Sequence, residues 1–206
     1  MATKQRGRPR AFDRDAALDK ALRAFWERGY EAVSIAELTR EIGIGAPSLY
    51  AAFGDKKALF DAALEVYGHS RNGTFINRAL DEEPTARAAI ARILREAAEG
   101  YTAPGQPKGC MVVSAGINTT TPEVAAELRE MRNGNIGLLA ERIQQDIAAG
   151  LLPPTTDAAG LARFVGAVIQ GMSTQARDGA STQELEQVAD AALRAWPAAE
   201  EIPPGA

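Results

Sequence analysis

Apolar residues recur at helical spacing along most of the chain. Between residues 14 and 28 they fall at i, i+3, i+4, i+7 and i+8, at Leu18, Ala21, Leu22, Phe25 and Trp26. Such spacing places them on one face of a helix, which we expect Asp13 to cap and Gly29 to end. Strand signals are nearly absent, and the β-branched pair Val112-Val113 lies within an otherwise helical pattern, so the sequence predicts no sheet.

Capping signals divide the first third of the chain into further helices. Ser34 with Glu37 three residues later has the form of a capping box and predicts a short helix to about Glu41. After a turn between Gly43 and Gly45, a third short helix is expected over 46–53. Asp55 is expected to cap a long helix that follows.

The rest of the chain carries similar signals. Pro84 has the position of a first-turn proline, Thr156 that of a cap, and Ser181 with Glu184 repeats the capping-box pattern. The helices expected there span 84–102, 110–119, 121–150, 156–177 and 181–196. The sequence therefore predicts an all-α protein of about nine helices.

The segment 34–53 is the most informative part of the sequence. Two short helices around a glycine turn, packed on a longer first helix, are typical of a helix-turn-helix DNA-binding unit. Their expected inward faces consist of Ile35, Leu38 and Ile42 in one helix and Ile44, Leu49 and Phe53 in the other. The remaining residues of the second helix are small or polar, as entry into a major groove requires. An ordinary helical hairpin is the alternative.

Charge is distributed unevenly along the chain. The net charge is −4, yet residues 1–57 hold 11 Lys and Arg against 8 Asp and Glu, whereas residues 58–206 hold 12 against 19. The first ten residues contain no acid and four basic residues, Lys4, Arg6, Arg8 and Arg10. A basic first part favours contact with phosphate, while a merely solvated terminus is the alternative interpretation.

The run from Gly7 to Phe60 resembles the N-terminal domain of the TetR/AcrR family of bacterial repressors. It has the basic arm, the amphipathic helix ending in Gly-Tyr, and the spacing of the helix-turn-helix. The matching positions are Gly29, Tyr30, Ser34, Ile35, Gly43, Ile44, Leu49, Tyr50, Phe53 and Lys56. The match covers about a quarter of the chain, and the remainder fits the family only by helix count and length.

The resemblance implies a ligand-responsive repressor that binds a palindromic double-stranded DNA operator as a homodimer and is released by a small-molecule inducer. It implies phosphate contacts by Ser34, Tyr50 and Lys56. It implies base contacts by Ala46, Pro47 and Ser48, and a minor-groove arm at Arg6, Arg8 and Arg10. The sequence departs from the pattern at Ala51 and Ala52, where many members have an aromatic residue and a histidine, so no base preference carries over.

The organisation expected from these signals has three parts. A DNA-binding domain covers 1–57, a ligand-binding and dimerisation domain covers 58–196, and a disordered tail covers 197–206. The small residues at helical spacing in 158–172 would suit a four-helix dimer interface with the last helix. Packing within one chain is the alternative.

A ligand cavity is expected among the large apolar residues after position 60, with a few polar side chains to orient the ligand. Each such residue could equally be plain core. The candidate ligand-binding residues are Tyr67, Tyr101, Met111, Asn118, Phe164 and Gln170.

Cys110 is the only cysteine and begins a predicted helix, with Lys108 nearby. A helix N-terminus and a cation both favour the reactive thiolate, so the alternative function is a thiol-based redox or electrophile-sensing repressor. The competing interpretation is a small buried hydrophobic residue.

Catalytic signatures are missing from the sequence. His69 is the only histidine, and the phosphate-loop-like start at 43–48 follows no predicted strand. We therefore expect no enzyme, cofactor or metal; a helical enzyme and a protein-interaction module remain as rival classes. No stretch of about 18 apolar residues occurs, and no apolar segment follows the basic N-terminus, which predicts a cytoplasmic protein without a membrane partner.

Overall fold

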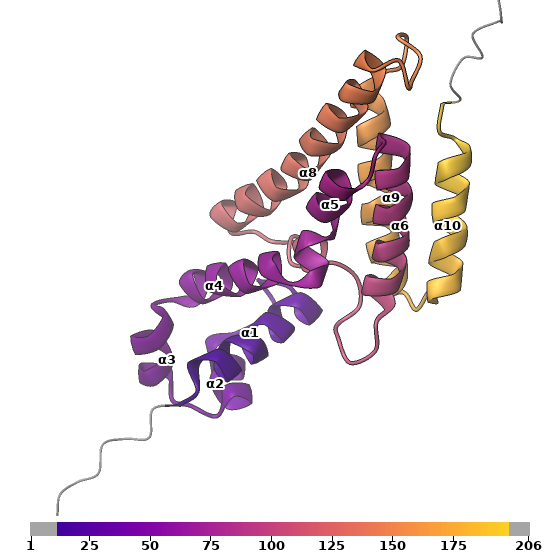
Figure 1. Ribbon diagram of the computed structural model, residues 1–206. Helices are drawn as coiled ribbons and strands as arrows, with labels where there is room; N and C mark the ends of the chain where they lie inside the picture. The colour runs from indigo at the N-terminus through magenta and orange to yellow at the C-terminus, as the bar shows by residue number, and fades with distance from the viewer. Residues whose placement is uncertain (1–11, 198–206) are drawn as a thin grey trace, which may run out of the picture.

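The computed structural model describes residues 12–197, and in that part of the chain all regular structure is α-helical. The all-α prediction is therefore confirmed there. Arg6, Arg8, Arg10 and residues 198–206 of the expected tail lie outside the described residues. The helices are α1 (Arg14–Arg28), α2 (Ile35–Ile42), α3 (Ala46–Phe53), α4 (Lys56–His69), α5 (Arg71–Glu82), α6 (Ala86–Thr102), α7 (Met111–Ser114), α8 (Pro122–Ala148), α9 (Ala158–Arg177) and α10 (Thr182–Arg194) (Figure 1).

The capping residues of the first helices are those that the sequence predicted. The Asp13 carboxylate accepts hydrogen bonds from the amides of Asp15 and Ala16. Ser34 and Glu37 form the complete capping box, and Asp55 Oδ1 accepts from the Ala58 amide at 2.8 Å. These interactions are local in sequence, so they can be predicted without knowing the tertiary fold.

Several later boundaries differ from the prediction. The long helix after Asp55 is interrupted at Ser70, whose hydroxyl donates to the Tyr67 carbonyl and accepts from the Gly73 amide, so α4 and α5 are separate helices. Described helices thus number ten rather than about nine. Thr85, not Pro84, directly precedes α6 and caps it. Asp157, not Thr156, caps α9. In each case the side chain of the capping residue accepts a hydrogen bond from the third amide of the helix. The predicted helix 110–119 shortens to the single turn α7.

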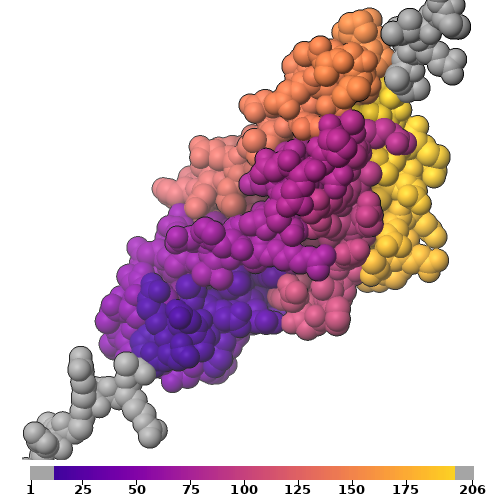
Figure 2. Space-filling model, in the orientation of Figure 1, coloured from indigo at the N-terminus to yellow at the C-terminus, as the bar shows by residue number. Residues whose placement is uncertain are grey.

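Two hydrophobic cores hold the helices together. The first joins the N-terminal lobe (α1–α4) to α7 and the beginning of α8, and contains an aromatic cluster of Phe25, Tyr30 and Phe60. The second lies in the C-terminal lobe (α5–α10), where α8 packs on α9 and α10 packs on α6 and α9. Figures 1 and 2 show the N-terminal lobe at one end of an elongated molecule and α10 along the opposite side.

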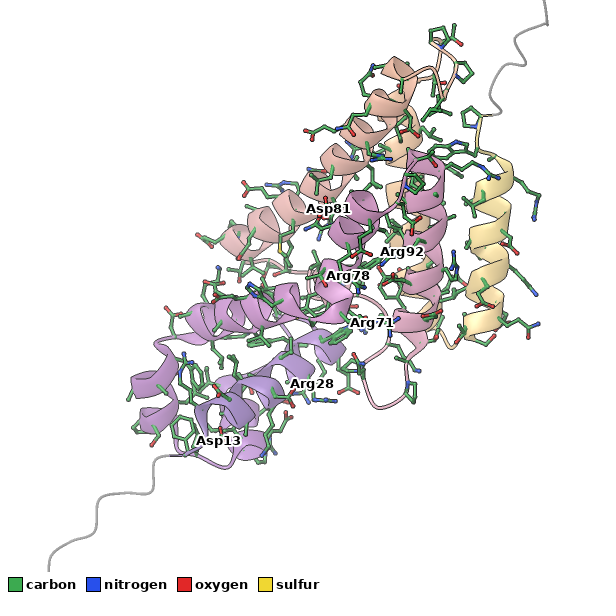
Figure 3. The ribbon with its side chains drawn as sticks, in the orientation of Figure 1. Asp13, Arg28, Arg71, Arg78, Asp81 and Arg92 are labelled. Atoms are coloured by element: carbon green, nitrogen blue, oxygen red, sulfur yellow. The ribbon has the colours of Figure 1, made fainter. Side chains whose placement is uncertain are left out.

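Ion pairs connect α5 and α6. Arg92 of α6 pairs with Glu82, Glu83 and Glu96, and Arg78 of α5 pairs with the same Glu96. Figure 3 shows Arg78 and Arg92 close together at this junction. Because the two arginines share one carboxylate, the pairs form a network rather than isolated surface contacts, and together they stabilise the α5–α6 pair.

Candidate nucleic-acid interface

The helix-turn-helix is built on two fully buried leucines. Leu38 of α2 and Leu49 of α3 have no exposed surface, and Phe53 is 7% exposed. Between the helices Gly43 adopts φ 86°, a left-handed conformation that side chains other than glycine rarely adopt, and its amide donates to the Thr39 carbonyl at 2.9 Å. The core contacts and the glycine turn together fix the orientation of α3 against α2.

One face of α3 is directed to solvent. Pro47, Ser48 and Ala51 are exposed, and Tyr50 exposes 47% of its surface although it is a large aromatic residue. Ala46 is half-buried at the start of the helix. This exposed face consists of small and polar residues and one tyrosine, while the opposite face of the helix packs on the core. An α-helix with such a face can enter a major groove.

Ser34 lies at the N-terminus of α2 but is already engaged. Its hydroxyl donates to Glu37 Oε2 at 2.7 Å and accepts from the Glu37 amide at 3.2 Å. A contact from this hydroxyl to phosphate would therefore require its proton to turn away from Glu37.

Lys56 begins α4, with its ammonium 4.2 Å from the centroid of the Tyr30 ring. Burial lowers the pKa of the ammonium, while Glu31 and Glu37 act in the opposite direction. A lysine held by an aromatic ring loses less conformational entropy on binding an anion than a free one.

Two further cations near these helices were missed by the sequence reasoning. Arg40 is exposed near the end of α2, and the Arg14 guanidinium lies 4.7 Å from the Phe53 ring centroid. The position of Arg40 opposite the inward residues of α2 was the signal that could have identified it. Arg14 lies on the same face of α1 as Leu18 and Phe25, so helical spacing gave no such signal for it.

Glu31, in the turn before α2, connects the helix-turn-helix to α8. Its Oε1 atom accepts hydrogen bonds from the amides and hydroxyls of the segment before α8, at 2.8 to 3.0 Å from Thr119, Thr120 and Thr121. These bonds, chiefly those from Thr121, lower the pKa of the carboxyl from 4.5 to about 2. Glu31, although distant in the sequence, thus satisfies backbone amides at the N-terminus of α8, as a capping residue does.

Replacing Glu31 with glutamine is expected to reduce stability in a pH-dependent manner. Because the folded pKa lies below the unfolded value, the carboxylate stabilises the fold fully above about pH 4.5 and loses this contribution as the pH falls towards 2. The difference in the free energy of unfolding between wild type and Glu31→Gln should therefore shrink on acidification. Urea unfolding at several pH values measures it, with Glu186→Gln as an exposed control; a difference that is constant with pH would contradict the prediction.

A cavity of about 260 Å³ lies between the C-terminal lobe and the end of α4, lined by residues of α4 to α9. Three of the predicted ligand residues, Tyr67, Tyr101 and Gln170, line it, and so does Cys110. The Tyr67 hydroxyl donates to Cys110 Sγ at 3.4 Å. Burial, reinforced by the neighbouring Cys110, raises the pKa of both tyrosine hydroxyls well above the ordinary value, so both stay protonated donors.

The other three predicted ligand residues do not line this cavity. Met111 is fully buried in the first hydrophobic core. Asn118 adopts φ 57° in the turn before α8 and lines a separate pocket beside Gly29 and Glu31. Phe164 is 40% exposed, because it lies on the face of α9 turned away from the core. Arg132, Asn135 and Leu139 of α8 do line the cavity; their helical spacing with Ile136 was the overlooked signal.

Between residues 12 and 197 no group of three or more His, Cys, Asp or Glu side chains could hold a metal ion. Among the described helices, none has the length and apolar character needed to cross a membrane.

Comparison with known proteins assigns the family. Residues 17–63 match the model of the bacterial regulatory proteins of the tetR family, and residues 86–192 match the tetracyclin repressor-like C-terminal domain. The chain belongs to the TetR family. The HTH-type transcriptional repressor ComR of Escherichia coli is 39% identical over 197 residues, which cover 94% of this chain and 93% of ComR. BdcR of the same organism, also an HTH-type transcriptional repressor, is 33% identical over 90% of this chain and 91% of its own.

A solved TetR-family structure extends the comparison to three dimensions. A cysteine mutant of the transcriptional regulator CifR, complexed with 26-bp double-strand operator DNA, is 45% identical with a TM-score of 0.85. The match covers 93% of this chain and all of the CifR chain. The predicted family and fold are thereby confirmed for this TetR-family transcriptional regulator, including the helix-turn-helix at its N-terminus.

Proposed function

We propose that this TetR-family regulator is a homodimeric repressor that binds a palindromic operator through α3 and is released by a small molecule. The exposed face of α3, supported from behind by Leu38 and Leu49, is the observation that carries the DNA-binding part. The operator complex of CifR, at 45% identity, supports it. In this proposal, residues 1–57 contact DNA, residues 58–196 bind the ligand and dimerise, and the protein acts in the cytoplasm.

The proposed roles follow the exposure of each side chain. Pro47 and Ser48 reach base edges, with Ala46 beside them, while Tyr50 and Lys56 bind phosphate on either side of the groove. Ser34 contributes at the start of α2. Arg6, Arg8 and Arg10 are proposed to reach the adjacent minor groove.

Replacing Tyr50 with phenylalanine is expected to weaken DNA binding by about tenfold on every sequence, because a hydrogen bond to a charged phosphate is lost while no base contact changes. Operator DNA is first selected from a random pool, and affinities for it and for single-base variants are then measured by fluorescence anisotropy. Ser48→Ala is the matched comparison, expected to change the order of preference among the variants. A Tyr50→Phe protein with altered base preference and unchanged overall affinity would reverse the two roles.

The proposed dimer interface lies on α9 and α10. The exposed face of α9 carries Phe164, Ala167 and Gly171, and α10 exposes 40% of Val188. Exposed large apolar side chains on two adjacent helices are what a four-helix interface with a second copy would cover. Gly166 does not belong to this face, because a Cβ there would lie 2.8 Å from Ile136 of the same chain. A charged side chain at Gly166 would therefore disturb the packing of α8 on α9 within one chain. Such a variant could not test dimerisation.

Ligand release is proposed to operate through the cavity. A ligand bound there releases DNA only if it binds more tightly to a conformation in which the two copies of α3 no longer match successive grooves. Helix α8 forms one wall of the cavity and is held by Glu31 at its N-terminus, so it connects the two sites directly. Ligands that stabilise the protein yet leave operator affinity unchanged would argue against this part of the proposal.

A second candidate function is thiol sensing, which the position of Cys110 favours. Its thiol is half-buried at the cavity, next to the Tyr67 hydroxyl. In this alternative an electrophile that enters the cavity modifies the thiol and releases DNA. Release from the wild type but not from Cys110→Ser would support it, and equal release from both would exclude it.

A further inference from the structure

The cavity is apolar except for a small set of polar groups, and one of them is charged. Its lining includes Phe75, Ile76, Ile136 and Leu139, together with amide side chains and tyrosine hydroxyls. Arg132 of α8 is the one residue in this lining that carries a charge at neutral pH, and no carboxylate lines the cavity. A single cation in such surroundings selects ligands by their charge.

Arg132 has no acidic partner among residues 12–197. Its Nη1 donates to the Val112 carbonyl at 2.9 Å, and no Asp or Glu oxygen of the described chain comes within 4.0 Å of the guanidinium. Other arginines of the same lobe differ: Arg78 and Arg92 pair with glutamates. A partly buried charge without a counter-ion is unfavourable, so an anion entering beside it would be stabilised.

The guanidinium is also held in place. A Cβ at Gly116 would lie 2.9 Å from Nη1, so the glycine leaves the space that this group occupies. Burial lowers the pKa of Arg132; the neighbouring Cys110 acts in the opposite direction, and Arg129 in the same direction as burial. A fixed, partly desolvated guanidinium presents its remaining N–H groups without first having to be ordered.

We propose that the ligand of this cavity is a small amphipathic carboxylate whose anionic group pairs with Arg132 and whose apolar part lies against Phe75, Ile76 and Leu139. The amides of Asn135 and Gln170, on the same two helices as Arg132 and Gly166, are placed to orient the carboxylate. A volume of about 260 Å³ suits a small molecule rather than a large conjugate. The proposal names the ligand class for the ligand-released repressor proposed above and rests on that function.

The test compares carboxylates with alcohols of the same shape. Calorimetric titration of the full-length protein with the straight-chain acids from butanoate to decanoate, and with benzoate, is set against the matched alcohols. The best carboxylate should bind the wild type at least about tenfold more tightly than its alcohol, since a charge-assisted hydrogen bond is lost in the alcohol. Equal affinities within every pair, or no binding by any of the acids, would overturn the proposal.

Variants then attribute the preference to one side chain. Arg132→Gln should bind acid and alcohol equally, and Arg132→Lys should keep part of the preference. Arg129→Gln, which removes an exposed arginine one turn away on α8, should keep all of it. A preference that persists in Arg132→Gln, or that is lost in Arg129→Gln, would contradict the assignment.

Titration of the protein–operator complex separates this inference from the function on which it rests. A carboxylate that binds through Arg132 but leaves operator affinity unchanged would support the ligand class and refute release by that ligand. Release by alcohols as effective as that by acids would support the repressor mechanism and refute the carboxylate.

Discussion

A Phe164→Glu protein is expected to be a monomer and to bind operator DNA at least about 100-fold more weakly than the wild type. The substitution places a charge on the exposed apolar face of α9, where the proposed partner copy would bury it without a counter-ion. A monomer contacts one half-site only, so the second recognition helix no longer adds to affinity. Analytical ultracentrifugation and anisotropy titration with the selected operator measure the two effects.

Val66→Glu provides the matched control for this experiment. Val66 is 43% exposed, close to the 40% of Phe164, but it belongs to α4 and not to the proposed interface. The control should therefore keep both the oligomeric state and operator affinity. If the Phe164→Glu protein is a monomer but keeps full affinity for the palindrome, the dimeric mode of binding is refuted. If the Phe164→Glu protein remains a dimer, the interface lies elsewhere.

Replacing Phe60 with alanine is expected to lower the free energy of unfolding by about 3–5 kcal/mol. Phe60 is fully buried, and its ring makes edge contacts with Phe25 and Tyr30 at centroid distances of 5.1 and 5.0 Å. The substitution removes both aromatic contacts and leaves a cavity that the surrounding helices cannot fill. Urea unfolding followed by circular dichroism measures the loss.

Phe12→Ala is the comparison within the same lobe. Phe12 is only partly buried, and its ring centroid lies 6.3 Å from that of Phe53, so its removal should cost much less. If the two substitutions destabilised the protein equally, the aromatic cluster around Phe60 would not be the centre of the first core.

The elements that could be predicted from sequence are those fixed by neighbouring residues. The capping box at Ser34, the cap at Asp55 and the glycine turn at Gly43 depend on groups within about four positions. The break at Ser70 was missed although it has local signals: no large apolar residue lies between Tyr67 and Phe75, and the Ser70 hydroxyl bonds groups only three positions away.

The cavity was harder to predict than the helix-turn-helix because six helices contribute to it. Tyr67, Tyr101 and Gln170 come from three different helices, and only their packing brings them together. Phe164 was chosen because it is a large apolar residue in a predicted helix. The sequence did not show whether its face of the helix is turned to the cavity or to solvent, and the structure places it on the solvent side. Arg132 was overlooked because a charged residue on a long helix is usually solvated. That it lines the cavity without an acidic partner among the described residues depends on how the helices pack.

The first hydrophobic core has a consequence for how such regulators diverge. It continues past residue 57, because Leu59 and Phe60 of α4 share it with Val112 of α7 and with Leu128 of α8. A chimera joined at residue 57 would therefore place its grafted helices on a surface shaped for other side chains, and it is expected to fold poorly. Substitution on the solvent face of α3 leaves these contacts untouched. New operator preferences should thus arise in this lineage through point changes on α3 more readily than through the exchange of whole N-terminal segments.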